Sequence, residues 1–394
     1  MLSPFLAIIG VLFAFGTTYL LNTFKILDIS KHFYTPIFLL ILYYTIATQW
    51  KRRKIETRPW KAIWIKSIAK YLFWGAAIGS VYLVYDNHGF YRSFAAHTRA
   101  MLENYLKLYA FVGLPYFLMA ERFRSSSYDW MNDPYLKLLS LTKLAWRKNW
   151  PLLRLRMGTK RYKSIFLMWI LRLHFLPVMA EQVYRGMNSS FHVFSAPHLS
   201  ILTLPFAIGF MFTIDSINAS IGYFWESAVT DTRFRRIDTN PFHWFVVLMC
   251  YMPFIVFASN FIPFPKAPSQ LGLIFSNHFA IGIWQAATAA TLLGIVICTS
   301  CLGFSYSNLS YKKIQTKGPY AIVRHPGTVF KITFFFLSVF QYKAAYTPAI
   351  IAAYVFWMGV YIMRVICEER FLMQFAEYRN YTYKTRFRLI PKVW

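Results

Sequence analysis

The chain has 394 residues, of which 57% are hydrophobic, 20% aromatic and only 15% charged. Soluble domains carry about 25% charged residues and disordered chains are poor in hydrophobic residues, so this composition argues against both classes. The 43 Lys and Arg against 15 Asp and Glu give a net charge of +28. Because the basic residues lie between long apolar runs, we expect an integral membrane protein and not a nucleic-acid-binding protein.

Ten apolar segments follow one another along the chain. A helix that crosses a membrane needs about 20 mostly apolar residues, and these segments reach or approach that length. The sequence therefore predicts an all-α, polytopic transmembrane helical bundle whose last two spans form a hairpin. The segments are residues 3–24, 35–50, 63–85, 101–119, 164–181, 199–225, 243–263, 277–303, 328–342 and 345–366.

The basic clusters all follow even-numbered spans. They lie at 51–54, 121–163, 233–236, 312–324 and in the tail after residue 366. Since Lys and Arg concentrate in cytoplasmic loops, this pattern places both termini in the cytoplasm. We expect a multi-pass protein of a bacterial inner membrane or of the endoplasmic reticulum, with its basic loops against the anionic membrane surface.

Within the segment 121–163, apolar and basic residues interleave from Tyr135 to Lys148. This pattern favours an interfacial amphipathic helix on anionic lipid. A solvated basic loop is the alternative.

Several ionisable or polar residues fall inside predicted spans, where their cost makes them functional candidates. Arg172 and His174 lie in the fifth span, and Asp215, Asn218 and Glu226 share one face of the sixth. A cavity lined by Asp215 and Arg172 and a structural ion pair between packed helices are both compatible with the pattern.

The range 317–327 reads Lys-Gly-Pro-Tyr-Ala-Ile-Val-Arg-His-Pro-Gly. Its Gly-Pro pair ends the preceding helix, and Pro326 suits the first turn of the next one. Arg324 and His325 are therefore expected at the membrane surface beside a helix N-terminus, where anions are favoured.

A second polar block follows the last span, in the range 364–372. Because the intervening hairpin is short, both of its ends return to one membrane face. Arg324 and His325 should then meet Glu368 and Glu369, with aromatic residues of the tail packed over them. Such a pocket offers cations for a carboxylate, carboxylates for ribose hydroxyls, and aromatic rings for a purine or a sulfonium. A structural salt-bridge cluster of Arg324, His325 and Glu368 that caps the hairpin is the alternative.

The two blocks and the tail resemble the C-terminal catalytic region of the isoprenylcysteine carboxyl methyltransferase family of integral membrane methyltransferases. The resemblance covers about residues 311–394. The matching residues are Gly318, Pro319, Tyr320, Val323, Arg324, His325, Pro326, Glu368, Glu369, Phe371, Leu372, Phe375, Glu377, Tyr378, Tyr381, Leu389, Ile390 and Pro391.

The resemblance implies an S-adenosylmethionine-dependent membrane methyltransferase that takes a lipid or lipidated acceptor from the bilayer. It implies a methyltransferase-like domain at 271–394 and an N-terminal multi-span region at 1–270. The residues implied to hold the cofactor are Gly318, Pro319, Tyr320, His325, Pro326, Glu369, Tyr378 and Tyr381, and the catalytic candidates are Arg324, Glu368 and Glu369. A carboxylate acceptor needs no general base, whereas an amine or hydroxyl acceptor needs one, for which Glu368 or Glu369 is the candidate.

The chain departs from the family pattern in two places. The family usually has Tyr two residues after the Pro and Gly two residues further on, and this chain has Thr328 and Phe330 there. We therefore expect the small-residue contact between helices to be lost and the acceptor pocket to be reshaped.

Two other classes of function remain open at this point. Sterol reductases resemble the same region distantly, which would imply an NADPH-dependent oxidoreductase. A transporter or scaffold with a degenerate methyltransferase end would explain Thr328, Phe330 and the polar residues of the fifth and sixth spans.

Overall fold

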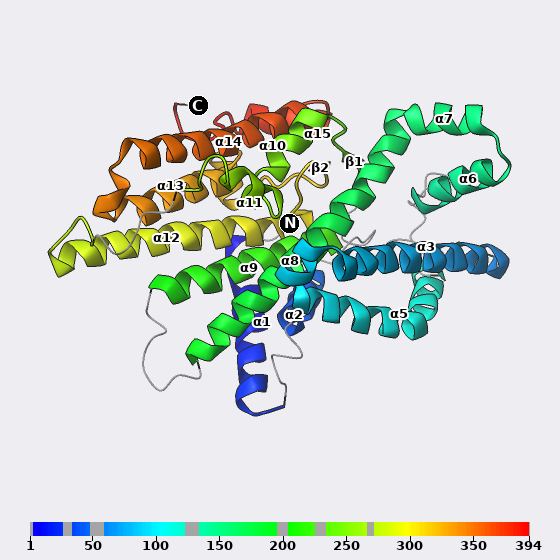
Figure 1. The fold of residues 1–394 in the computed structure, drawn as a ribbon, viewed down its shortest axis with the longest axis horizontal. Coiled ribbons are helices and arrows are strands. Elements are labelled where there is room, and N and C mark those ends of the chain that lie inside the picture. Colours follow the sequence, from blue (N-terminus) through cyan, green and yellow to red (C-terminus); the bar gives the residue numbers. More distant parts are fainter. Residues whose placement is uncertain are drawn as a thin grey trace. The chain divides into compact units, whose positions relative to one another are not determined.

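The described residues of the computed structural model are almost entirely helical (Figure 1). The structure describes residues 3–26, 34–47, 59–122, 134–194, 204–224, 234–265 and 272–393. The chain divides into two compact units, and each is a discontinuous set of segments. The first unit comprises Met1–Thr48, Gln182–Gly222 and Asn240–Trp394, and the second comprises Gln49–Glu181 and Tyr223–Thr239.

The first unit contains most of the helices that surround the predicted site. They are α1 (Pro4–Thr23), α2 (Thr35–Ala47), α9 (Leu204–Phe224), α10 (Pro241–Leu248), α11 (Phe254–Ser259), α12 (His278–Leu302), α13 (Pro326–Phe340), α14 (Pro348–Leu372) and α15 (Ala376–Lys384), with the short strand β2 (Ser310–Tyr311) and the 3-10 turn η5 (Gly318–Ala321). In this unit α12 packs on α1 and α13, and α14 packs on α13 and α10.

The second unit is built on the long pair α3 and α5. Its elements are α3 (Trp60–Asn87), α4 (Gly89–Phe94), α5 (Ala96–Arg122), α6 (Pro134–Trp146), α7 (Trp150–Gly158), most of α8 (Lys160–Phe194) and the short strand β1 (Arg236–Ile237). The buried pair Lys70 and Glu121 links α3 to α5. The rings of Tyr71 on α3 and Tyr109 on α5 also stack, with their centroids 5.1 Å apart.

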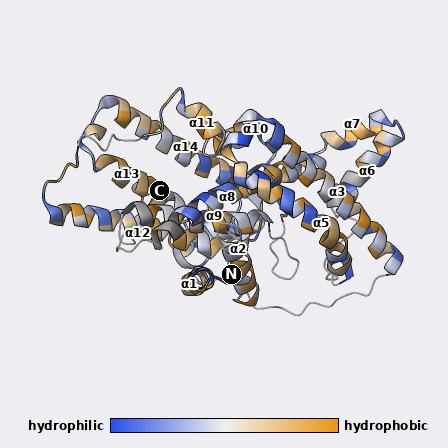
Figure 2. Cartoon of the chain, turned by 60° about the horizontal axis from the view of Figure 1, so that its bottom comes forward, coloured by the Kyte–Doolittle hydropathy of each residue, from blue (hydrophilic) through white to orange (hydrophobic). Residues whose placement is uncertain are grey.

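Five helices of the described ranges are long and apolar enough to cross a membrane: α1, α3, α8, α12 and α14. Hydrophobic residues occur along the helices of both units (Figure 2). The all-helical prediction is confirmed and the membrane prediction is supported, but ten spans are not confirmed. The predicted seventh span, 243–263, is interrupted: α10 and α11 have 8 and 6 residues, or about 12 and 9 Å of helix, against a hydrocarbon core of about 30 Å.

The predicted domain boundary at residue 270 lies inside the segment Asn240–Trp394 of the first unit. Helices α1 and α2 belong to the same unit as the C-terminal helices. The assignment of 271–394 as a methyltransferase-like domain remains a prediction.

The polar residues of the predicted sixth span have partners inside the first unit. Asn218 accepts a hydrogen bond from the Tyr44 hydroxyl at 2.9 Å and donates to the Ser300 hydroxyl at 3.0 Å, which ties α9 to α2 and α12. Asp215 pairs with Lys331 of α13 at 3.4 Å. Arg172, the other residue of the predicted cavity, belongs to the second unit, where its guanidinium lies over the Phe234 ring. Asp215 thus makes an ion pair between helices of the first unit, and the cavity shared with Arg172 stays a prediction.

Two predictions concern residues outside the described ranges. Glu226 and the basic run 51–54 are among these residues.

The close contact between α12 and α13 is kept despite Phe330. A Cβ atom on Gly294 would lie 2.5 Å from the Phe330 ring, so the small residue is on α12 and the large one on α13. The expectation that a small-residue contact is lost at Phe330 is therefore wrong. The missing side chain of Gly294 on α12 leaves the space that the Phe330 ring of α13 fills.

We predict that Gly294→Ala destabilises the protein by about 1–3 kcal/mol, the range for overpacking a dense interior. The double variant Gly294→Ala, Phe330→Leu should recover most of the loss. The measurement is the thermal denaturation midpoint of detergent-purified protein. Gly282→Ala is the matched control, since it lies on the same helix with nothing within 4 Å of the added Cβ. Equal effects of the two glycine substitutions would contradict the packing argument.

Candidate functional site

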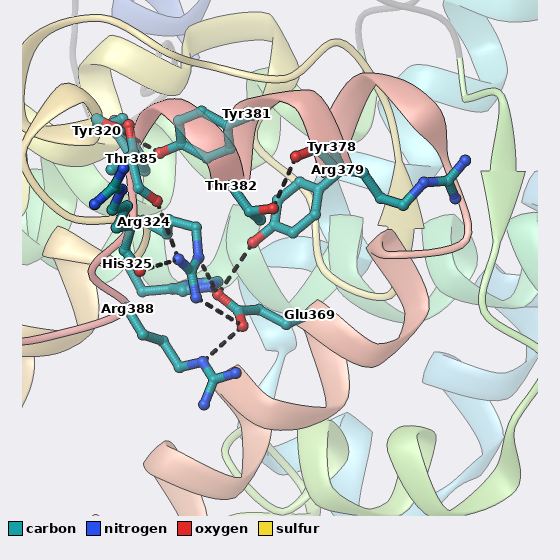
Figure 3. Close-up of polar contacts among 11 residues, drawn as sticks. Tyr320, Arg324, His325, Glu369, Tyr378, Arg379, Tyr381, Thr382, Thr385 and Arg388 are labelled. Atoms are coloured by element: carbon teal, nitrogen blue, oxygen red, sulfur yellow. Dashed lines mark hydrogen bonds and ion pairs between the residues drawn. The ribbon is translucent and has the colours of Figure 1, made fainter. Parts of the chain in front are cut away.

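Glu369, near the end of α14, accepts contacts from four side chains (Figure 3). Arg324 binds it through two nitrogens, with Nε 2.6 Å from Oε1 and Nη2 3.2 Å from Oε2. Arg388 Nε donates to Oε2 at 2.6 Å. His325 Nε2 and the Tyr378 hydroxyl each lie 3.2 Å from Oε1. Both oxygens of this carboxylate are therefore saturated, and the Glu369 side chain is only 5% exposed.

The turn before α13 is shaped by its glycine and prolines. Gly318 has a φ of +64°, which a residue with a Cβ rarely adopts. A Cβ there would also lie 2.7 Å from Pro4, the first residue of α1. Pro326 begins α13 directly after His325, where its missing N–H costs nothing. These features fix the backbone on both sides of Arg324 and His325.

The C-terminal tail closes over the same turn. The backbone N–H groups of Arg324 and His325 donate to the carbonyls of Phe387 and Arg388, each at 3.0 Å. Arg324 Nη1 donates to the carbonyl of Thr385 at 3.0 Å. The tail is thus held by main-chain bonds as well as by charge.

Three tyrosines surround this arrangement. Tyr381 donates from its hydroxyl to the Tyr320 carbonyl at 2.5 Å, and Tyr320 donates to the Cys298 carbonyl at 3.3 Å. Burial raises the pKa of Tyr320, Tyr378 and Tyr381 above that of an ordinary tyrosine. All three hydroxyls are therefore neutral hydrogen-bond donors at physiological pH and not general bases.

Glu368 differs from its neighbour. It is half-buried, and it makes no hydrogen bond or ion pair with the residues that the structure describes. Arg364, one helical turn earlier, donates to the Asn308 side chain at 2.5 Å and lies over the Tyr251 ring at 5.7 Å. Arg364 also makes no ion pair with a described carboxylate. Glu368 and Arg364 thus present unused acceptor and donor capacity beside the saturated Glu369.

The structure brings the two predicted polar blocks together. Arg324, His325 and Tyr378 all contact Glu369 directly, and Tyr320 and Tyr381 contact each other. The structural alternative proposed a salt-bridge cluster around Glu368, but the cluster forms around Glu369.

The sequence reasoning missed three contributors. Arg388 and Thr385 complete the cluster from the tail, and Pro4 approaches Gly318 from α1. The excess of cations over acids in this region was the available signal for Arg388. No pattern in the sequence indicated Pro4.

Comparison with models of known protein families, with curated proteins and with solved structures finds no match.

We predict that Glu369→Gln destabilises the protein by about 3 kcal/mol, because it leaves the buried Arg324 without a counter-charge. Glu368→Gln is the matched control and should change stability by well under 1 kcal/mol, since Glu368 makes no hydrogen bond or ion pair with a described residue. Thermal denaturation of both variants in the same detergent measures the difference. A control variant as unstable as Glu369→Gln would show that the two neighbours do not have separate roles.

Proposed function

We propose that the protein is an integral membrane methyltransferase that uses S-adenosylmethionine and acts on a lipid or lipidated acceptor. The observation that carries the proposal is the meeting of the 317–327 turn, the end of α14 and the tyrosines of α15 around Glu369. These are the segments whose residues resemble the methyltransferase family. Their proximity in the first unit is the arrangement that a shared cofactor site requires.

The contacts of the two glutamates suggest that they have different roles. Glu369 has its hydrogen-bonding capacity filled by protein groups, so we assign it to positioning Arg324 and His325. Glu368 has capacity left, and we assign it to ligand contact. His325 uses Nε2 toward Glu369, and its Nδ1 makes no hydrogen bond to a described residue, so that nitrogen is also available to a ligand.

These residues fit S-adenosylmethionine chemically. The unpaired carboxylate of Glu368 suits ribose hydroxyls or a cationic group, and the surplus cations of the cluster suit the cofactor's carboxylate. The tyrosine rings provide aromatic faces for a sulfonium or a purine.

When bound, S-adenosylmethionine supplies a methyl group already activated on a sulfonium. In an in-line transfer the bond from sulfur to the methyl carbon breaks as the bond from the acceptor forms. The protein then has to align the two groups and exclude water. With a carboxylate acceptor no proton moves. With an amine or hydroxyl acceptor, Glu368 takes the proton.

We predict that detergent-purified protein binds S-adenosylmethionine and S-adenosylhomocysteine in calorimetry. His325→Ala and Glu368→Gln should each weaken binding about tenfold, as expected when one or two hydrogen bonds to charged groups are lost. Gly282→Ala, on the exposed side of α12, should bind as the native chain does.

Competition separates the methyltransferase from an oxidoreductase. S-adenosylhomocysteine should displace the cofactor and NADPH should not. Binding of NADPH alone, or of neither compound by folded protein, would overturn the proposal.

A further inference from the structure

Helices α6 and α7 form a hairpin in the second unit (Figure 1), which we call the basic hairpin, residues 134–158. The stretch from residue 134 to 163 contains nine Lys and Arg and no Asp or Glu. Lys143, Arg147, Lys148 and Arg154 make no ion pair with a described carboxylate. These four cations therefore lack counter-charges within the described part of this chain.

The turn of the basic hairpin is a defined structure. Lys148 has a φ of +54°, its N–H donates to the Ala145 carbonyl, and the N–H of Asn149 donates to the Leu144 carbonyl. This bonding ends α6 in a Schellman motif. The Asn149 side chain then caps α7 by accepting from the Leu152 N–H at 3.3 Å. The order of this turn depends on its own backbone bonds and needs no further contact.

The turn displays large apolar side chains next to its cations. Trp146 is 89% exposed and Trp150 is 53% exposed, on either side of Arg147 and Lys148. Farther along α7, Leu155 is also exposed, and α7 is coloured as hydrophobic along much of its length in Figure 2. Exposing two tryptophans to water at this capped turn is unfavourable, whereas tryptophan is favoured at a membrane interface.

The basic hairpin directly precedes a helix that is long and apolar enough to cross a membrane. Helix α7 ends at Gly158 and α8, one of the five membrane-length helices, begins at Lys160. Ser140 of α6 lies within hydrogen-bonding distance of Tyr162 of α8 at 3.3 Å, and Arg156 of α7 donates to Ser140 at 3.5 Å. The hairpin is thus attached directly to the end of a span.

We propose that the basic hairpin is a binding site for the phosphate groups of anionic lipids. Its lysines and arginines contact the phosphates, and Trp146 and Trp150 insert at the level of the headgroups. A lipid surface explains the exposed tryptophans and the attachment to α8 together. An acidic protein or a nucleic acid would account for the charge alone.

Lys148 separates a lipid-binding role from a structural one. Its left-handed backbone conformation is the one that glycine adopts most easily. Lys148→Gly should therefore relieve the backbone while removing a lipid-facing charge. A structural role for Lys148 predicts no loss of lipid dependence in this variant.

The test uses the full chain in nanodiscs of phosphatidylcholine alone or mixed with phosphatidylglycerol. Hydrogen–deuterium exchange of the peptides covering 144–158 should slow in the anionic discs at low salt and recover at high salt. Each cation near an anionic surface strengthens docking about fivefold. The triple variant Arg147→Gln, Lys148→Gly, Arg154→Gln should therefore weaken docking about a hundredfold and abolish the difference between the two discs.

The control variant Arg370→Gln, Lys384→Gln, Lys392→Gln removes three exposed cations elsewhere and should keep the native difference. Lys148→Gly alone should exchange no faster than the native chain in neutral discs, which shows that the turn is intact. Equal exchange of the native hairpin in both discs, or the same loss in the control variant, would overturn the proposal. Slowed exchange on addition of nucleic acid or acidic protein, without an effect of anionic lipid, would also overturn it.

Discussion

The arrangement of the C-terminal region depends on one carboxylate. Glu369 is almost fully buried, and a buried charge is tolerated only when it is paired and hydrogen-bonded. Two arginines, a histidine and a tyrosine meet this requirement, and they come from the turn before α13, from α15 and from the tail. Satisfying this one charge therefore draws the three segments together, in addition to the main-chain bonds between the turn and the tail and the bond from Tyr381 to Tyr320. The cluster stabilises the fold of this region. In our proposal it also positions the ligand-binding residues, because it holds Arg324, His325 and Glu368 beside one another.

Two close contacts at glycine residues join the helices around the cluster. Pro4 of α1 occupies the space that a side chain on Gly318 would need, and Phe330 of α13 fills the space left by Gly294 of α12. The first of these contacts connects the 317–327 turn to a helix far away in the sequence. Helix α1 therefore packs directly against the turn of the candidate site, and α2 belongs to the same unit.

The sequence predicted the helical class, the meeting of the two polar blocks and most of the residues around Glu369. Local chemistry made this possible, because Gly318, Pro319 and Pro326 mark the ends of elements and the short hairpin constrains where they return. It did not predict which glutamate is paired, since Glu368 and Glu369 are adjacent and only the rotation of α14 distinguishes them. It also placed the missing small residue wrongly, because a pattern along one helix does not show what the facing helix contributes. The interruption at Pro253 was hidden by the continuous hydrophobicity of 243–263.

In the function that we propose, the cofactor lies against the 317–327 turn and the end of α14. Ultraviolet crosslinking of radiolabelled S-adenosylmethionine to the full chain, followed by mass spectrometry of the labelled peptides, tests it most directly. The account predicts label within residues 318–326 and 364–381, and loss of that label with excess S-adenosylhomocysteine. Label confined to peptides of the second unit, or label that excess S-adenosylhomocysteine does not remove, would contradict it.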